Sequence, residues 1–349
     1  MQFNIGDVAV YLMMGNKLIQ LVLMLIVAIF NHSASAEYSA SKCKSLSNKK
    51  LYELDKVYIR DEFRIYYSSA EFYPSPTDFS RDTVPDKVIN ISKQLVAGRR
   101  IFSEVMGMTH PLSQPRYHQA KYIDVNLLSL SKGNGLAYDE VFGYLRHDAV
   151  NNDECVLRID INSKISLGNL TPAHELFHLY QYGYTMFKSP WLLEGTARWA
   201  EFAFKSYRYS KQDLPKNEKE LEEYLFHKTY DAQEFWLRIA GIVDPVGKTI
   251  VPQELRNFYY LGGQRLNVEE RIHGADFIRE LFEELGMEDK KVARANGWSE
   301  ILWKESDQRN EIHNTSILNV LHKVLENHIN EEHKHGELND FLSIEISGN

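Results

Sequence analysis

The sequence predicts an α+β protein in which strands and helices mix in the first half and helices fill the second half. Two patterns carry this prediction. Residues 155–161 alternate two sets of side chains with the period of two that a strand shows. From Asn169 onward, apolar residues instead recur every three or four positions, which is the spacing of one helix face. A chain of 349 residues with 44% hydrophobic and 25% charged residues is globular, so disorder is excluded.

Residues 1–36 are predicted to be a secretory signal peptide. An apolar run covers 18–30, and Ala34, Ser35 and Ala36 form the small-x-small pattern of a cleavage site. Cleavage after Ala36 makes the mature protein secreted or periplasmic. A membrane anchor is the alternative, but thirteen apolar residues are short for a span of about 20. No other segment is long and apolar enough, so no membrane insertion is expected after cleavage.

Charge and cysteine content limit the partners and the metal chemistry. Forty-eight acidic against forty basic residues give a net charge of −8, and no basic cluster is available for a nucleic acid. Cys43 and Cys155 are too few for a disulfide scaffold or a cysteine-based zinc finger. Export permits a disulfide between them, and two separate buried thiols are the alternative. Any metal site must therefore use histidines and carboxylates.

The mature chain is predicted to contain a flexible lead-in over 37–60, an α/β subdomain over 61–183 and a helical subdomain over 184–349. Pro85 opens a helix, because its fixed φ suits a first turn. Three glycines predict an irregular or edge strand within 132–144. The other predicted strands cover 63–67, 122–128 and 155–161, and the later helices cover 171–182, 191–206, 217–227, 230–240, 252–260, 273–286 and 315–330.

The helix over 171–182 has recognisable ends. Thr171 is expected to cap it, Pro172 suits its first turn, and Gly183 is expected to end it. Side chains four residues apart on this helix therefore project from one face.

His174 and His178 have this spacing, and they lie about 6 Å apart along the axis. Two imidazoles so placed can hold one zinc ion. Glu175, about 100° further round the helix, lies where it can take a proton from a water molecule on the metal. The motif therefore predicts a metal centre with its own general base.

A catalytic zinc also needs a third protein ligand and an open fourth position. A metzincin would have glycine and histidine where this chain has Gln181 and Tyr184, so that class is excluded. Glu194 comes sixteen residues after His178, near the start of a new helix and after a Ser-Pro loop that lets the chain turn back. Glu194 is therefore the predicted third ligand. A solvent-facing pair with Arg198 is the alternative.

Two motifs together carry a family resemblance. They are His174-Glu175-x-x-His178 and Trp191-Leu192-x-Glu194-Gly195-x-Ala197-x-Trp199-x-Glu201. This combination resembles the gluzincin clan of zinc metallopeptidases, in particular the secreted bacterial peptidase MA-like proteins, over about residues 60–290. The resemblance implies a zincin-like fold, one catalytic Zn²⁺ held by His174, His178 and Glu194, and Glu175 as the catalytic base. The Gly-x-Met-Glu-Asn segment of gluzincin aminopeptidases is missing, which favours an endopeptidase.

Two further side chains are assigned roles around this centre. The resemblance makes Tyr230 the donor that stabilises the oxyanion, with His227 as runner-up and packing on Phe235 or Trp236 as the alternative for Tyr230. Glu201, seven residues past Glu194, is expected to accept a hydrogen bond from the outer nitrogen of a ligand imidazole. A salt bridge to Arg198 accounts for Glu201 equally well.

The substrate is expected to be a peptide or protein. Residues 135–138 are the candidate sheet edge for an extended peptide, and a glycine-rich hairpin without ligand is the alternative. The predicted function is an exported zinc endopeptidase. The alternatives are a zinc-dependent hydrolase or toxin acting on a non-peptide substrate, and a binding module without turnover.

Overall fold

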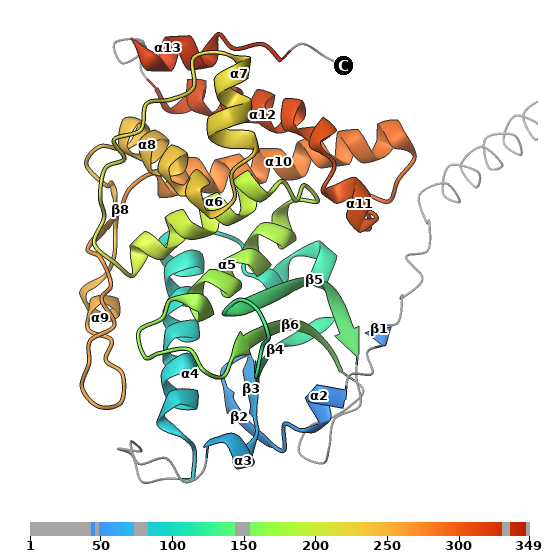
Figure 1. The fold of residues 1–349 in the computed structure, drawn as a ribbon, viewed down its shortest axis with the longest axis vertical. Helices are drawn as coiled ribbons and strands as arrows, with labels where there is room; N and C mark the ends of the chain where they lie inside the picture. The colour runs from blue at the N-terminus through green and yellow to red at the C-terminus, as the bar shows by residue number, and fades with distance from the viewer. Residues whose placement is uncertain (1–42, 46–48, 73–82, 144–153, 330–335, 347–349) are drawn as a thin grey trace, which may run out of the picture. The chain divides into compact units, whose positions relative to one another are not determined.

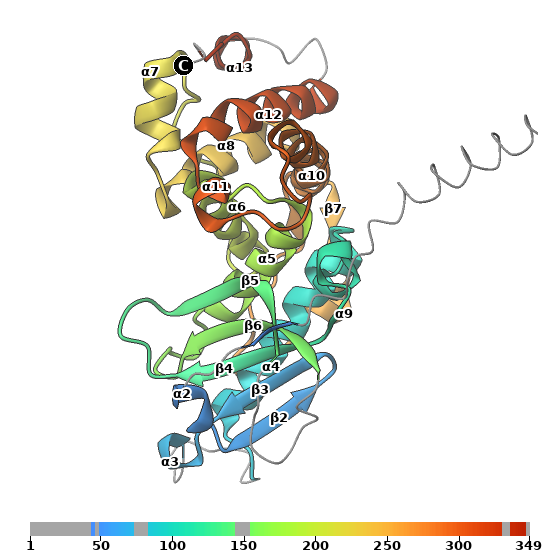
Figure 2. The same cartoon turned by 90° about the vertical axis from the view of Figure 1, so that its right-hand side faces the viewer.

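The strand-forming segments of the first half build one mixed six-stranded sheet (Figures 1 and 2). In spatial order its strands are β1 (Lys44–Ser45), β5 (Gly135–Gly143), β6 (Cys155–Asn162), β4 (Ala120–Leu128), β3 (Phe63–Tyr67) and β2 (Lys56–Arg60). β6, β4 and β3 are parallel, β5 and β2 are antiparallel to their neighbours β6 and β3, and β1 runs parallel to β5. A mixed sheet followed by helices confirms the predicted α+β class.

This computed structural model describes residues 43–45, 49–72, 83–143, 154–329 and 336–346. The predicted signal peptide lies outside these residues. In the described part of the chain, no helix combines the length and the apolar character needed to cross a membrane.

One face of the sheet packs against two helices, α4 (Asp86–Arg99) and α5 (Thr171–Tyr184). The alternation along β6 shows why. Leu157 and Ile159 are fully buried in the core shared with these helices, whereas Arg158 between them projects from the opposite face. The sheet therefore gives α5 an apolar platform that fixes its orientation.

The second half is mostly helical, as predicted. α6 (Pro190–Ala200) packs against both α5 and α8 (Gln233–Val243), and α10 (Ala275–Asn296) packs against α12 (Asn314–His328). α5 and α6 thus lie at the junction of the sheet and the helices. The shorter elements are α2 (Lys49–Tyr52), α3 (Ser69–Phe72), η1 (Arg100–Val105), η2 (Pro111–Ser113), η3 (Pro115–Tyr117), η4 (Glu201–Ala203), α7 (Glu218–Leu221), η5 (Glu222–Phe226), η6 (Tyr230–Ala232), β7 (Thr249–Ile250), α9 (Gln253–Arg256), β8 (Arg271–Ile272), α11 (Glu305–Gln308), η7 (Glu311–His313) and α13 (Glu337–Leu342).

Several predicted boundaries differ from the structure. The helix over 191–206 ends at Ala200 as α6, and the helix over 273–286 runs on to Asn296 as α10. The flexible lead-in over 37–60 is wrong for Lys56–Arg60, which form β2 and pair with β3 along their whole length. β2 is an edge strand in which Lys56 and Ile59 are exposed and the other three side chains are partly buried, so it lacks the regular alternation that would have revealed it. The helix over 252–260 ends already at Arg256, since Tyr259 pairs with Arg265 across a turn of two glycines with positive φ.

The two subdomains predicted on either side of residue 183 lie within a single compact unit, Cys43–Asn349. Cys43 and Cys155 form a disulfide with their Cα atoms 5.7 Å apart, which joins the segment before β1 to the start of β6. Disulfides persist in oxidising compartments and are rare in the cytosol. This bond is therefore typical of a protein outside the cytoplasm.

Candidate metal centre

The centre is built on α5, whose ends differ from the prediction. Leu170 precedes the first helical residue, and the side chain of Asn169 accepts hydrogen bonds from the N–H and the hydroxyl of Thr171 (2.9 and 2.6 Å). Gly183 does not end the helix, which runs on to Tyr184. A Cβ at Gly183 would lie 2.8 Å from the Gln114 side chain, so glycine is needed for this close contact.

The structure brings His174, His178 and Glu194 together, with one ligand atom from each lying within 4.8 Å of the others. The two Nε2 atoms are 3.1 Å apart, and Glu194 Oε2 lies 3.2 Å from that of His174 and 3.5 Å from that of His178. A tetrahedral ion with bonds of about 2.0–2.1 Å has ligand atoms about 3.3 Å apart. The spacing of the three side chains therefore fits one face of a tetrahedral metal coordination shell.

The outer ring nitrogens set the tautomers of both histidines. His174 Nδ1 contacts Glu201 Oε1 at 2.9 Å, and His178 Nδ1 contacts Gln181 Oε1 at 2.6 Å. Both contacts are to acceptor oxygens, so each Nδ1 carries a hydrogen. In a neutral ring Nε2 then has a free lone pair, which points toward the space between the two rings and Glu194. Two lone pairs and a carboxylate oxygen that face one another fit a bound cation.

In the protein without metal, these groups shift one another's pKa values. Burial lowers the pKa of His174, but hydrogen bonds to Glu194 and Glu201 outweigh it and raise the pKa to about 9. Burial raises the pKa of Glu194, but hydrogen bonds from His174 and His178 hold this pKa well below its usual range. Metal binding must therefore displace a proton from His174.

Glu175 is on α5, and its side chain lies against β5. A Cβ at Gly135 would lie 2.5 Å from Glu175 Oε1, so only glycine lets the strand come this close to the carboxylate. Burial raises the pKa of Glu175, while the two histidines and the backbone N–H of Ala137 oppose this rise. A buried carboxylate with a raised pKa is suited to accept and return a proton.

Glu201 makes both of the contacts that the sequence left open. Besides His174, its carboxylate accepts hydrogen bonds from Arg198 Nη1 at 3.1 Å and from Lys205 Nζ at 2.8 Å. Burial raises the pKa of Glu201, but His174 and Lys205 outweigh it and lower the pKa to about 2. Glu201 therefore stays ionised beside the ring of His174.

Sequence reasoning missed the role of Gln181. Its side-chain amide accepts from His178 and donates to the Leu193 carbonyl (2.8 Å) and to the Thr196 hydroxyl (2.6 Å). Gln181 is fully buried and links the ligand helix to α6. Its position three residues after His178 on the same helix is the signal that could have revealed it.

Tyr230 lies at the mouth of the site, and His227 does not. The Tyr230 ring is 6.1 Å from the His174 ring, and its side chain is half exposed. η6 can come this close to α6 because residue 195 is glycine: a Cβ there would lie 2.9 Å from the Cβ of Ala232, the last residue of η6. His227 is exposed and pairs with Glu222 at 3.3 Å.

A cavity of about 360 Å³ opens beside these groups. Its walls are the turn of Gly133 and Gly135, the first residues of α5 with Glu175, and the side chains of Arg198 and Tyr230. A small molecule in this cavity would therefore contact Glu175 and His174, the one candidate metal ligand that lines it.

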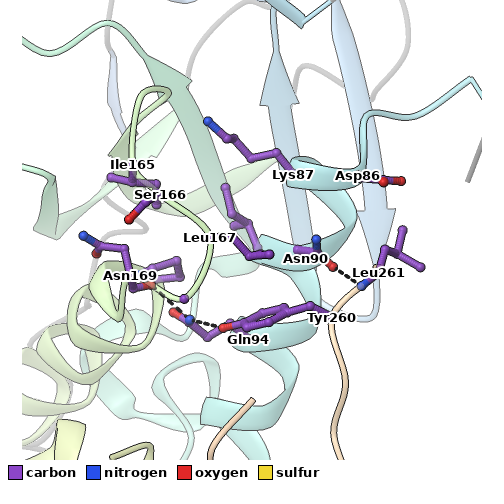
Figure 3. Close-up of a pocket in the computed structure, with 13 residues that line it drawn as sticks. Asp86, Lys87, Asn90, Gln94, Ile165, Ser166, Leu167, Asn169, Tyr260 and Leu261 are labelled. Carbon is purple, nitrogen blue, oxygen red and sulfur yellow. Dashed lines mark hydrogen bonds between the residues drawn. The ribbon is translucent and has the colours of Figure 1, made fainter. Parts of the chain in front are cut away.

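A second cavity of about 300 Å³ lies at the start of α5, against α4 (Figure 3). Within it the Gln94 side chain donates to the Asn169 carbonyl (3.1 Å) and the Tyr260 hydroxyl (2.7 Å), and accepts from the Ala173 N–H (3.2 Å). None of the metal-centre side chains lines it. The hydrogen bonds of Gln94 therefore tie α4 to the first turn of α5.

No protein-family model, curated protein or solved structure matches this chain. The α+β fold and the buried His174, His178 and Glu194 group are thus the findings that bear on function.

Proposed function

We propose that the protein is an exported zinc-dependent endopeptidase with a zincin-like fold. The observation that carries the proposal is the convergence of His174, His178 and Glu194 with the carboxylate of Glu175 at the wall of a cavity. Three protein ligands leave a fourth position for water, which is the arrangement of catalytic zinc, whereas structural zinc sites are closed by four. The resemblance to gluzincins supports zinc as the ion.

Glu175 is the proposed general base and acid. When bound, zinc lowers the pKa of a water molecule toward 7 and polarises a peptide carbonyl. Glu175 accepts the proton of the attacking water and then donates it to the departing amine. Its raised pKa and its fixed place against Gly135 and Ala137 suit both transfers.

Tyr230 is the proposed oxyanion donor. Its hydroxyl would donate a hydrogen bond to the oxygen that gains negative charge as the carbonyl is attacked. The position of its ring beside His174 supports this role, whereas His227, paired with Glu222, is not proposed.

The edge of the sheet supports an extended peptide as substrate. β1 pairs only with Phe142 and Gly143 of β5, and no other described strand covers the outer side of Gly135–Tyr138. An extended peptide can therefore pair with these backbone groups beside Glu175. The missing aminopeptidase segment favours cleavage within the chain.

Export is proposed on two grounds. The sequence predicts a signal peptide cleaved after Ala36, and the Cys43–Cys155 disulfide is typical of an oxidising compartment.

The test is the substitution Glu175→Gln in the mature protein, with zinc content and hydrolysis of a peptide library measured together. We expect about one zinc per chain in both proteins, and a loss of about 10²-fold or more in hydrolysis for the variant. A chelator should abolish the activity of the unmodified protein.

Zinc retained by an unmodified protein that cleaves no peptide would contradict the peptidase proposal. That result would favour a hydrolase or toxin with another substrate, or a binding module. Loss of folding on zinc removal would make the ion structural.

A further inference from the structure

Arg198 lies in the wall of the metal-centre cavity, one turn after Glu194 on α6. Of the described residues that line this cavity, it is the only lysine or arginine. Its side chain is 40% exposed, so a ligand in the cavity can reach it.

Two neighbours hold the guanidinium in place. Arg198 Nη1 donates to both oxygens of Glu201 at 3.1 Å, and its Cζ lies 5.1 Å from the centre of the Tyr230 ring. A guanidinium has five N–H donors in a rigid fork, and both hydrogen bonds that Arg198 makes to described residues use Nη1. The remaining donors are available to a ligand in the cavity.

The charge balance favours an anionic ligand on this side. A single Glu201 carboxylate serves both Arg198 and Lys205, so it does not neutralise Arg198 alone. The other carboxylates near the cavity are Glu175 and Glu194, which a bound divalent cation would offset. With the ion present, the wall at Arg198 carries an excess of positive charge.

We propose that Arg198 binds a carboxylate of the substrate and so selects acidic substrates. An arginine fork pairs with a carboxylate through two parallel hydrogen bonds, which gives orientation as well as affinity. The carboxylate comes either from an Asp or Glu side chain next to the cleaved bond or from the free C-terminus of a short peptide. This inference rests on the proposed peptidase function, because it names the substrate of that same cavity.

The test measures binding, so it does not depend on turnover. Calorimetry on the zinc-loaded Glu175→Gln protein would measure the affinity for four versions of one short peptide. The versions carry either Glu or Gln at one position, and each ends in either a free carboxylate or an amide. We expect the preferred carboxylate peptide to bind about 10-fold or more tightly than its neutral partner. The Glu/Gln pair tests a side-chain carboxylate, and the acid/amide pair tests the C-terminal carboxylate.

Adding Arg198→Gln to the Glu175→Gln protein should remove the preference for the carboxylate peptide. Arg198→Lys in its place should keep part of that preference. Lys205→Gln is the matched control, because Lys205 pairs with Oε2 of the same Glu201 but is not among the described residues that line the cavity. The control should keep the preference. Circular dichroism and zinc content show whether each variant is folded and loaded.

Equal binding of all four peptides, or a preference that survives Arg198→Gln, would overturn the role of Arg198. The same peptides given to the unmodified enzyme test cleavage separately. Carboxylate-selective binding without cleavage would contradict the peptidase function while leaving the role of Arg198 intact. Cleavage of all four peptides without selectivity would support the peptidase function and contradict the role of Arg198.

Discussion

The two histidines of the centre lie in different surroundings. His174 faces the cavity, and its outer nitrogen contacts the charged Glu201, which also holds Arg198 and Lys205. His178 faces the interior, and its outer nitrogen contacts the neutral, fully buried amide of Gln181. A charged carboxylate thus orients the ring of His174, and a neutral amide orients the ring of His178.

The interior side extends into a buried ionic network. The Tyr182 ring stacks on His178 at 5.8 Å, and its carbonyl accepts from Arg116 at 2.7 Å. Asp139 on β5 pairs with Arg116 and with Lys188, which lies between α5 and α6 (2.9 Å). This network joins β5 to α5 and to the segment between α5 and α6.

The contrast predicts that stability and metal binding depend on separate residues. Changes on the interior side should appear mainly as lost folding free energy, because they leave buried polar groups without partners. Changes on the cavity side should appear mainly in metal affinity and substrate binding.

The largest expected effect is that of Asp139→Asn. Burial raises the pKa of Asp139, but Arg116 and Lys188 outweigh it, so the carboxylate is charged and balances two buried cations. Its loss should lower the free energy of unfolding by about 3–5 kcal/mol, measured by urea denaturation. Glu305→Gln, which removes the exposed partner of Lys188, is the control and should change it by less than about 1 kcal/mol. Similar losses of unfolding free energy for Asp139→Asn and Glu305→Gln would contradict the stabilising role of the buried network.

The next largest effect is expected for Gln181→Met. Methionine fills a similar space, but it takes away the acceptor of His178 Nδ1 and the amide donors to the Leu193 carbonyl and the Thr196 hydroxyl. We expect a loss of about 2–3 kcal/mol in the metal-free protein, again by urea denaturation. An unchanged unfolding curve would mean that the interior side does not depend on this amide.

The pH dependence of stability tests a second buried carboxyl on the interior side. Burial raises the pKa of Asp289 to about 7, against a hydrogen bond from the Met186 N–H. The folded state keeps a proton that the unfolded state releases near pH 4, so this contribution is complete below that pH and is lost as the pH rises through about 7.

Asp289→Asn should remove this loss. Between pH 5 and pH 8 the metal-free unmodified protein should lose on the order of 2 kcal/mol relative to the variant. Parallel stability profiles for the two proteins would show that Asp289 titrates normally.

Glu201→Gln should have the smallest effect on folding and act on zinc instead. The amide oxygen still accepts from His174 but no longer carries charge, so zinc affinity should fall by about 10-fold in a competition titration. A larger loss of stability than for Gln181→Met would reverse the assignment of the two sides.

Local patterns made part of this arrangement predictable from sequence. The spacing of His174 and His178 fixes their common face within one helix, and the Ser-Pro loop before Glu194 allows the chain to turn back. The pairing of Cys43 with Cys155 and the contact of Asp139 with Lys188 depend on how distant segments pack. No periodicity reports such distances.

β2 was missed for another reason. Its pairing with β3 is made by backbone groups, while its side chains are at most partly buried and show no regular alternation. Gln181 was within reach of sequence reasoning, because it lies on the predicted ligand helix three residues beyond a predicted ligand.

The most direct test of a metal centre at His174, His178 and Glu194 is an anomalous difference map from zinc-loaded crystals of the mature protein. We expect one peak about 2.0–2.2 Å from the two Nε2 atoms and a Glu194 oxygen, with water at the fourth position. A peak at other residues, or Glu194 turned away from the ion, would contradict it.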